Sequence, residues 1–531
     1  MVGAQLLFHF LNVMLLTALV APLVLWRYRR AVLAGMQTKV GAAIALAPAL
    51  GPRPRAAPAS LPGVDAKLAW EARMRRRVFV AVVAALLPPA LLLAVHYVVV
   101  NGLPLTPAHL LLFAATATLM AVPMVGVLTA ISFSRTVVLG IATLCAFAAA
   151  SVAVSMLQRP LMGKVPTLDQ LLNFFTFLEF AAVTLAVPLV LAAAIGARRV
   201  RGVAPFVFAG LLVFATAPLL GMHVTQLLGA MRWSAGSVLS GGIHVGAIVL
   251  ALPVGLLAWW RLKSLARAYD AKRFSDAQLL AHNWWLMFVA VYAVEQVNAH
   301  PGSAALVQTV AVAALAYALF PFLLSHTLAR AQRGLPAMPR RMLLVLRIFG
   351  DSARTGALFE RFASRWQRYG PVTTIAAPDA AAATVDPGDL LRFATGRIAA
   401  GFVTSRDDLV QRLASLDVEP DRDGRYRITE LCCRDDTWQG TVVALIARAD
   451  AIVMDLRGFT PARRGAEFEL EQLATRASPD RVVLVVDATT DRELVARASS
   501  AGAAPMAIME VRRGSARQAD AAFVALLAAA G

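Results

Sequence analysis

Nine long apolar runs in the first 326 residues restrict the fold of this chain more than any other feature. A helix needs about 20 apolar residues to cross the hydrocarbon core of a bilayer. Over the whole chain 59% of the residues are hydrophobic and 16% are charged, which excludes a disordered chain or an ordinary soluble enzyme. The sequence therefore predicts an α-helical polytopic membrane bundle over residues 1–327. The expected spans are 6–26, 78–100, 108–132, 136–156, 173–197, 203–222, 242–260, 283–299 and 303–326.

The distribution of Lys and Arg predicts how these spans are oriented. With the N-terminus outside, the inside loops 27–77, 133–135, 198–202 and 261–282 hold 20 basic residues. The outside loops 101–107, 157–172, 223–241 and 300–302 hold three. Basic residues collect in cytoplasmic loops, so everything after residue 327 is expected in the cytoplasm. The segment 31–50 is apolar but interrupted, and we expect it to be interfacial or re-entrant.

The same distribution argues against nucleic acid as a partner. Residues 1–335 carry 25 basic and 7 acidic residues, whereas residues 336–531 carry 26 and 25. The net charge of +19 therefore belongs to the hydrophobic part, where it is a topology signal. The lipid bilayer is the expected partner.

Three ionisable residues fall within the expected spans and near one depth, in the outer leaflet: His96, Glu179 and Glu295. Such residues are often functional because placing a charge in a bilayer is costly. One interpretation is a proton or ligand site open to the outer face. The other is three unrelated polar residues near an interface, and the sequence leaves both open.

A different pattern begins after a basic linker at residues 328–341. Short apolar runs at 342–348, 372–376, 451–456, 481–488 and 506–511 alternate with amphipathic stretches of helical length. This alternation predicts a cytoplasmic α/β domain over residues 342–531 with a mainly parallel sheet. Residues 426–432 are expected to form a strand or a hairpin.

Ligands of open α/β sheets bind beyond the carboxyl ends of the strands. That rule selects ligand-binding candidates here: Gly350, Asp351, Ser352, Asp455, Arg457, Gly458 and Asp487. A helix carrying Glu467, Glu469 and Glu471 follows Asp455. Glu467 and Glu471 are four residues apart and share a face, so Glu469 is the one expected to point inward.

The run ADAIVMDLRGFTPARRGAEFELEQLA and the later RVVLVVDATTD resemble two related α/β families. These are the nucleoside 2-deoxyribosyltransferases and the Toll/interleukin-receptor (TIR) domains, and Glu469-Leu470 matches a Glu-Leu or Glu-Ile at the helix start of both. The resemblance implies a flavodoxin/TIR-like sheet for residues 342–531. It also implies that Glu469 is a catalytic carboxylate at the anomeric carbon of NAD or a nucleoside. An insert of roughly 40 residues before residue 451 fits neither family.

Three functions remain open on the sequence alone. The first is a membrane-anchored signalling or defence protein that binds a nucleotide such as NAD or a nucleoside, or cleaves it at its N-glycosidic bond. The second is a transporter or channel with a regulatory cytoplasmic domain, and the third is a non-catalytic scaffold that self-associates through that domain.

No metal site is expected, because the adjacent Cys432 and Cys433 are poorly placed to chelate one ion. No cofactor beyond the nucleotide substrate is implied. The Arg- and Ala-rich composition suggests a GC-rich bacterial genome. We therefore expect the protein in a bacterial cytoplasmic membrane.

Overall fold

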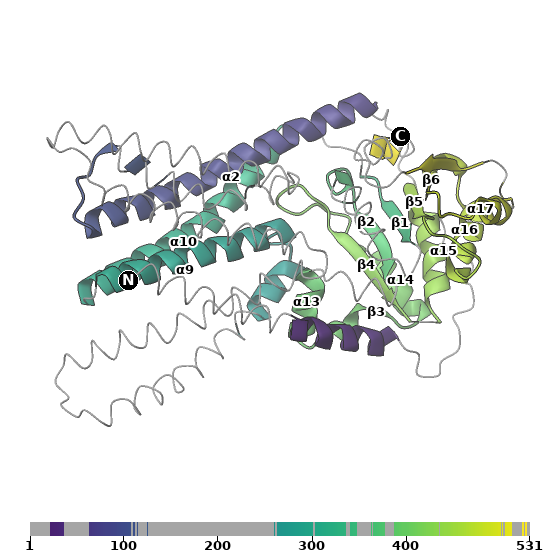
Figure 1. The fold of residues 1–531 in the computed structure, drawn as a ribbon, viewed down its shortest axis with the longest axis horizontal. Helices are drawn as coiled ribbons and strands as arrows, with labels where there is room; N and C mark the ends of the chain where they lie inside the picture. Colours follow the sequence, from purple (N-terminus) through teal and green to yellow (C-terminus); the bar gives the residue numbers. More distant parts are fainter. Residues whose placement is uncertain are drawn as a thin grey trace, which may run out of the picture. The chain divides into compact units, whose positions relative to one another are not determined.

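The computed structural model describes residues 22–36, 63–107, 263–300, 303–335, 340–347, 365–376, 387–434, 436–500 and 505–511, with single positions outside these ranges (Figure 1). The chain divides into two compact units. We call Met1–Leu25 with Arg75–Arg333 the helical unit, and Trp26–Met74 with Gly334–Gly531 the α/β unit. Helix α2 (Val64–Val100) contributes to both.

In the helical unit, α9 (Asp276–Ala299) packs against α10 (Ser303–Gln332). The indole of Trp285 donates to the carbonyl of Ala316 at 3.0 Å, and its ring lies 5.3 Å from that of Phe320. Helix α9 begins at a capping box in which the Ser275 side chain accepts from the Gln278 amide. The buried Trp285 N–H therefore finds its hydrogen-bond partner on the neighbouring helix.

Two of the described helices, α2 and α10, are long and apolar enough to cross a membrane. Both also expose large apolar side chains: Phe79, Val80, Leu87, Leu91, Val95, Val99, Val307, Leu315 and Phe322. Helix α9 contains the expected span 283–299. The expected spans 6–26, 108–132, 136–156, 173–197, 203–222 and 242–260 lie wholly or mostly outside the described residues, as does most of the segment 31–50.

The α/β unit is built on a seven-stranded sheet in which every described pairing is parallel. The strand order is β3-β4-β2-β1-β5-β6-β7. The strands are β1 (Leu343–Arg347), β2 (Val372–Ala376), β3 (Phe402–Val403), β4 (Ile428–Cys433), β5 (Ala451–Asp455), β6 (Val482–Val486) and β7 (Ala507–Glu510). The helices among them are α13 (Pro387–Ala394), α14 (Arg406–Ala414), α15 (Trp438–Arg448), α16 (Arg464–Arg476) and α17 (Arg492–Ser499), with 3-10 turns at Ile398–Gly401 and Pro479–Arg481.

The prediction of a mainly parallel sheet is therefore confirmed. Strands β2-β1-β5-β6-β7 follow the order of a five-stranded doubly wound sheet. The insert before residue 451 adds β3 and β4 in parallel beyond β2. The structure predicted over 426–432 is therefore a parallel strand, β4 (Ile428–Cys433), and not a hairpin.

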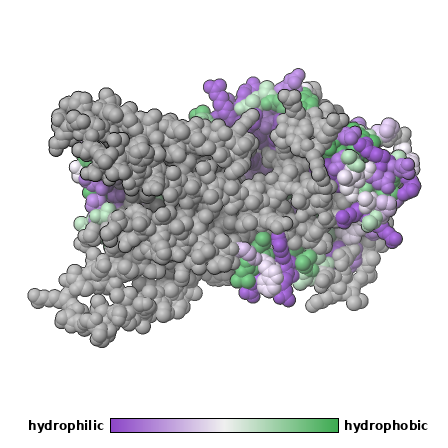
Figure 2. Space-filling model, viewed as in Figure 1, coloured by the Kyte–Doolittle hydropathy of each residue, from purple (hydrophilic) through white to green (hydrophobic). Residues whose placement is uncertain are grey.

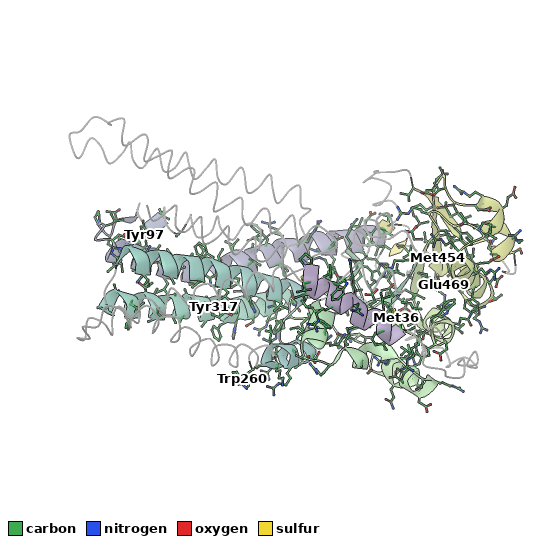
Figure 3. All side chains as sticks on the ribbon, turned by 60° about the horizontal axis from the view of Figure 1, so that its bottom comes forward. Met36, Tyr97, Trp260, Tyr317, Met454 and Glu469 are labelled. Carbon is green, nitrogen blue, oxygen red and sulfur yellow. The ribbon has the colours of Figure 1, made fainter. Side chains whose placement is uncertain are left out.

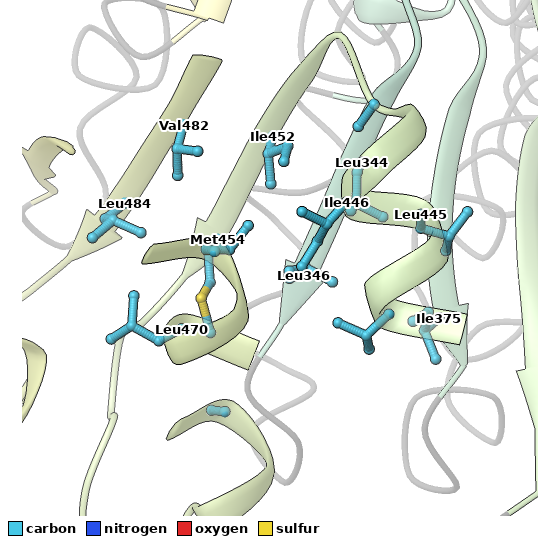
Figure 4. Packing of buried hydrophobic residues seen from close by; sticks show 14 of the residues in the cluster. Leu344, Leu346, Ile375, Leu445, Ile446, Ile452, Met454, Leu470, Val482 and Leu484 are labelled. Carbon is cyan, nitrogen blue, oxygen red and sulfur yellow. The ribbon is translucent and has the colours of Figure 1, made fainter. Parts of the chain in front are cut away.

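The central strands β1, β5 and β6 are apolar up to their last residues, as expected of strands that are covered on both faces. Every residue of β1, β5 and β6 is buried. Leu344, Leu346, Ile452, Met454 and Leu484 share one cluster with apolar residues of α14–α17 (Figure 4). The described surface of this unit mixes hydrophilic and hydrophobic residues (Figure 2).

The α/β unit also contains an amino-terminal segment, which begins far ahead of residue 342. In the first turns of α2, Glu71 accepts from Arg365 at 3.1 Å and from the Tyr369 hydroxyl at 3.2 Å. The Lys67 ammonium donates to the carbonyl of Leu527 at 3.0 Å. In the expected linker, Arg341 pairs with Asp450 at 3.4 Å, so that residue also belongs to this unit.

Candidate functional site

The sheet reverses its winding between β1 and β5. From β1 the chain continues to β2 on one side, and from β5 it continues to β6 on the other side. Doubly wound sheets bind their ligands at such a reversal, outside the carboxyl ends of the strands. Arg347 and Asp455 are register partners at those ends, so the candidate site is built around them.

Asp455 and Arg457 form the tightest ion pair at this edge. The Arg457 Nε and Nη2 atoms lie 2.8 Å and 2.7 Å from the two carboxylate oxygens. The Arg457 backbone amide also donates to Asp455 at 3.2 Å. This two-pronged geometry fixes the guanidinium plane. Gly458 follows with a φ of 77°, a conformation that favours glycine.

A second ion pair at this edge was not anticipated from the sequence. Arg347, 9% exposed, reaches across β2 to Glu430 on β4, with 3.1 Å between Nη2 and Oε1. Its signal was present: Arg347 is the one charged residue in the apolar run MLLVLRI. A charged residue in an otherwise buried strand needs a partner, and Glu430 lay in the insert whose structure the sequence left open.

The loop after β6 brings Asp487 to the same edge. Its carboxylate accepts from the Thr489 amide at 2.9 Å and from the Thr489 hydroxyl at 2.6 Å. Partial burial raises the pKa of Asp487, but these hydrogen bonds, a contact with Thr490 and the Arg457 charge bring it below its usual range. The Thr490 hydroxyl donates to the carbonyl of Leu456 at 2.9 Å, which ties this loop to the one after β5.

Glu469 lies within the α/β core on α16 (Figure 3). It is 1% exposed, whereas Glu471 is exposed and Glu467 is half-buried, as helical spacing predicts. Its Oε2 atom has no hydrogen-bond partner. Burial raises the pKa of Glu469 to about 8, so the group is mainly a neutral acid at pH 7.

Glu469 and Asp455 belong to opposite sides of the sheet. Helix α16 packs its Leu470 in the cluster that contains Met454 (Figure 4). Successive side chains of a strand point to opposite faces, so Asp455 points away from the face that α16 covers. A single ligand can therefore meet both carboxyl groups only beyond the end of β5.

The remaining predicted residues are distributed as follows. Gly350, Asp351 and Ser352, expected at the end of β1, lie outside the described residues, as do Glu179 and the side chain of Glu295. His96 is 4% exposed and takes part in a polar network with α9 and α10. The other members of that network were not anticipated from the sequence.

The two adjacent cysteines lie on β4. Cys433 is buried, and burial raises the pKa of its thiol to about 11. A thiol with that pKa is a poor nucleophile and metal ligand near neutral pH. Within the described residues, no group of three His, Cys, Asp or Glu side chains is arranged to hold a metal ion.

No family model, curated relative or solved structure matches this chain.

Proposed function

We propose that the chain is a multi-pass protein of a bacterial cytoplasmic membrane, with its N-terminus outside and the α/β unit in the cytoplasm. The apolar lengths of α2 and α10 and their exposed apolar side chains support this placement. The concentration of basic residues in one set of loops supports the orientation. Reporter fusions after residues 165 and 335 should report opposite sides, and a report of the same side for both would refute the topology.

We further propose that the α/β unit binds a nucleotide, with NAD as the first candidate, and that the protein acts in signalling or defence. The reversal of winding between β1 and β5 carries this proposal. Arg457 offers a positive charge to a phosphate, and the carboxylates of Asp455 and Asp487 offer acceptors to ribose hydroxyls.

Cleavage of the N-glycosidic bond would use Glu469. In that reaction the C1′–N bond breaks and the base leaves with the electron pair. Water then adds its oxygen to C1′ and releases a proton. Positive charge develops on the ribose ring, and an adjacent carboxylate stabilises it.

The neutral state of Glu469 in the free protein sets a requirement for this chemistry. The carboxyl group must lose its proton before it can stabilise positive charge. A ligand that carries a positive charge, as the nicotinamide ring of NAD does, favours the carboxylate form. A neutral nucleoside gives no such help, so NAD is the preferred substrate of the two.

The experiment uses the full chain in detergent micelles with NAD or 2′-deoxyadenosine. Binding is followed as an increase in the unfolding temperature, and cleavage as free base separated by chromatography. Asp455→Asn with Arg457→Ala should remove binding. Glu469→Gln should retain binding but lower base release by roughly a hundredfold or more, whereas Glu471→Gln, an exposed glutamate of the same helix, should behave as wild type.

Two outcomes would change the proposal in different ways. If neither compound raises the unfolding temperature at millimolar concentration, the nucleotide site is refuted. If NAD binds but no base is released by wild-type protein, catalysis is refuted and a nucleotide-binding function remains.

A further inference from the structure

Helix α9 and its C-cap residue carry three polar side chains at a spacing of four residues: Tyr292 and Gln296 on the helix, and His300 at the cap. Residues at this spacing lie on one face of a helix. Gln296 and His300 both bond to Asn101, just beyond the end of α2, at 3.2 Å each. This polar face therefore joins α9 to the end of α2.

The third residue of the face makes the most informative contacts. The Tyr292 hydroxyl donates to the carbonyl of Leu93 at 3.1 Å and lies 2.7 Å from His96 Nδ1. A phenol has one proton to donate. We assign that proton to the Leu93 carbonyl, which can only accept, so that Nδ1–H of the neutral His96 donates to the Tyr292 oxygen.

This assignment leaves the basic nitrogen of a neutral His96 at Nε2. Nε2 lies 3.5 Å from the hydroxyl oxygen of Thr309 on α10, and Thr309 is fully buried. In the neutral state the hydroxyl donates to Nε2. After protonation, Nε2–H donates to the same oxygen, so both ring nitrogens keep a partner in either charge state.

Among the residues that the structure describes, the titratable groups near His96 come from α9 and the residue that caps it. Helix α9 contributes Tyr292, and its C-cap residue His300 interacts electrostatically with His96. Helix α10 contributes Thr309, which does not titrate. The side chain of Glu295, also on α9, is outside the described set. The test therefore includes a Glu295→Gln variant, which separates any effect of this residue from that of His96.

We propose that His96 is a proton-binding site of the helical unit, in which a proton added at Nε2 is held by a hydrogen bond from Nε2–H to the Thr309 hydroxyl oxygen. The site makes the packing of α2, α9 and α10 sensitive to pH at the acidic end of the range, about 5 to 8, in which histidine ordinarily titrates. It stands apart from the proposed nucleotide site, because it uses other residues in the other unit.

The test is the unfolding temperature of the full chain in lipid nanodiscs between pH 5 and pH 8, followed by tryptophan fluorescence. All variants are made in a background of His300→Gln and Glu469→Gln, which removes the titration of the neighbouring histidine and of the buried acid in the α/β unit. His96→Gln should remove the pH-dependent part of the unfolding temperature. His326→Gln, an exposed histidine on α10, and Glu295→Gln should retain it.

A second pair of variants keeps the test informative if His96→Gln does not fold. Thr309→Val removes the hydroxyl that accepts from the charged ring, whereas Thr309→Ser keeps it. Thr309→Val should lower the unfolding temperature by about 2–4 °C more at pH 5 than at pH 8, relative to Thr309→Ser. Equal pH profiles for His96→Gln and its parent, equal differences between the two Thr309 variants at both pH values, or loss of the pH dependence in Glu295→Gln alone would overturn the proposal.

Discussion

The two units hold their buried polar groups in different ways. At the sheet edge of the α/β unit, Asp455 pairs with Arg457 and Arg347 pairs with Glu430. In the helical unit, the described contacts around His96 involve hydroxyl, imidazole and carbonyl groups. Removing a charge from water costs several kcal/mol unless it is paired, whereas neutral groups need only hydrogen bonds.

Glu469 departs from the pattern of its own unit. It is as deeply buried as the paired carboxylates, but its Oε2 atom has no hydrogen-bond partner. The α/β unit therefore contains both paired carboxylates and a neutral carboxyl group. Glu469 is the position at which the contrast between a charged α/β unit and a neutral helical unit is most directly tested.

The largest expected effect is the pH dependence of stability caused by Glu469. Its pKa is about 8 in the folded chain, against an ordinary value of 4.5 for a solvated glutamate. Above pH 4.5 the unfolded chain releases this proton and the folded chain keeps it, so stability falls as pH rises towards 8. The fall is about 1.4 kcal/mol per pH unit and reaches about 3–5 kcal/mol in total.

Glu469→Gln should abolish this fall because glutamine does not titrate. The measurement is urea unfolding in detergent between pH 5 and pH 8, followed by tryptophan fluorescence, since Trp438 contacts Phe468 on α16 at 5.3 Å between ring centroids. Glu471→Gln is the control on the same helix and should keep the wild-type slope. An unchanged slope in Glu469→Gln would show that Glu469 is ionised in the folded chain.

The smallest expected effect comes from the helical unit and concerns the neutral hydroxyl of Tyr292. Tyr292→Phe removes the hydroxyl that bonds to His96 and Leu93. Hydrogen bonds between membrane helices contribute about 0.6 kcal/mol on average, with a maximum near 1.7 kcal/mol. Tyr292→Phe should therefore lower the free energy of unfolding by an amount within that range, as measured by thermal unfolding.

A double-mutant cycle with His96→Phe assigns this loss to the pair. The interaction energy should be of the same size as the single loss. A loss of about 3 kcal/mol or more would contradict the comparison, because a neutral network would then behave as a buried ion pair does.

The fold of the α/β unit was predictable where the strands are long and apolar. β1, β5 and β6 are such strands, and the helices between them have clear amphipathic spacing. β3 was missed because two residues, Phe402–Val403, give no periodic pattern. Its pairing with β4 depends on contacts that local sequence does not encode.

The site was predictable in part, for a related reason. The strand-end rule selected Asp455, Arg457 and Asp487 without knowledge of strand order. Glu430 could not be selected, because its role depends on β4 lying two strands from β1. In the helical unit, the spacing of Tyr292, Gln296 and His300 is visible in the sequence, but spacing does not reveal which helix faces them.

The first turns of α2 are synthesised long before some of the residues that they contact. Lys67 and Leu527, which bond in the α/β unit, are 460 residues apart. At about 5–20 residues per second, roughly 20–90 s separate their emergence from the ribosome. The hydrogen bond between Lys67 and the Leu527 carbonyl can therefore form only after nearly the whole chain has been synthesised.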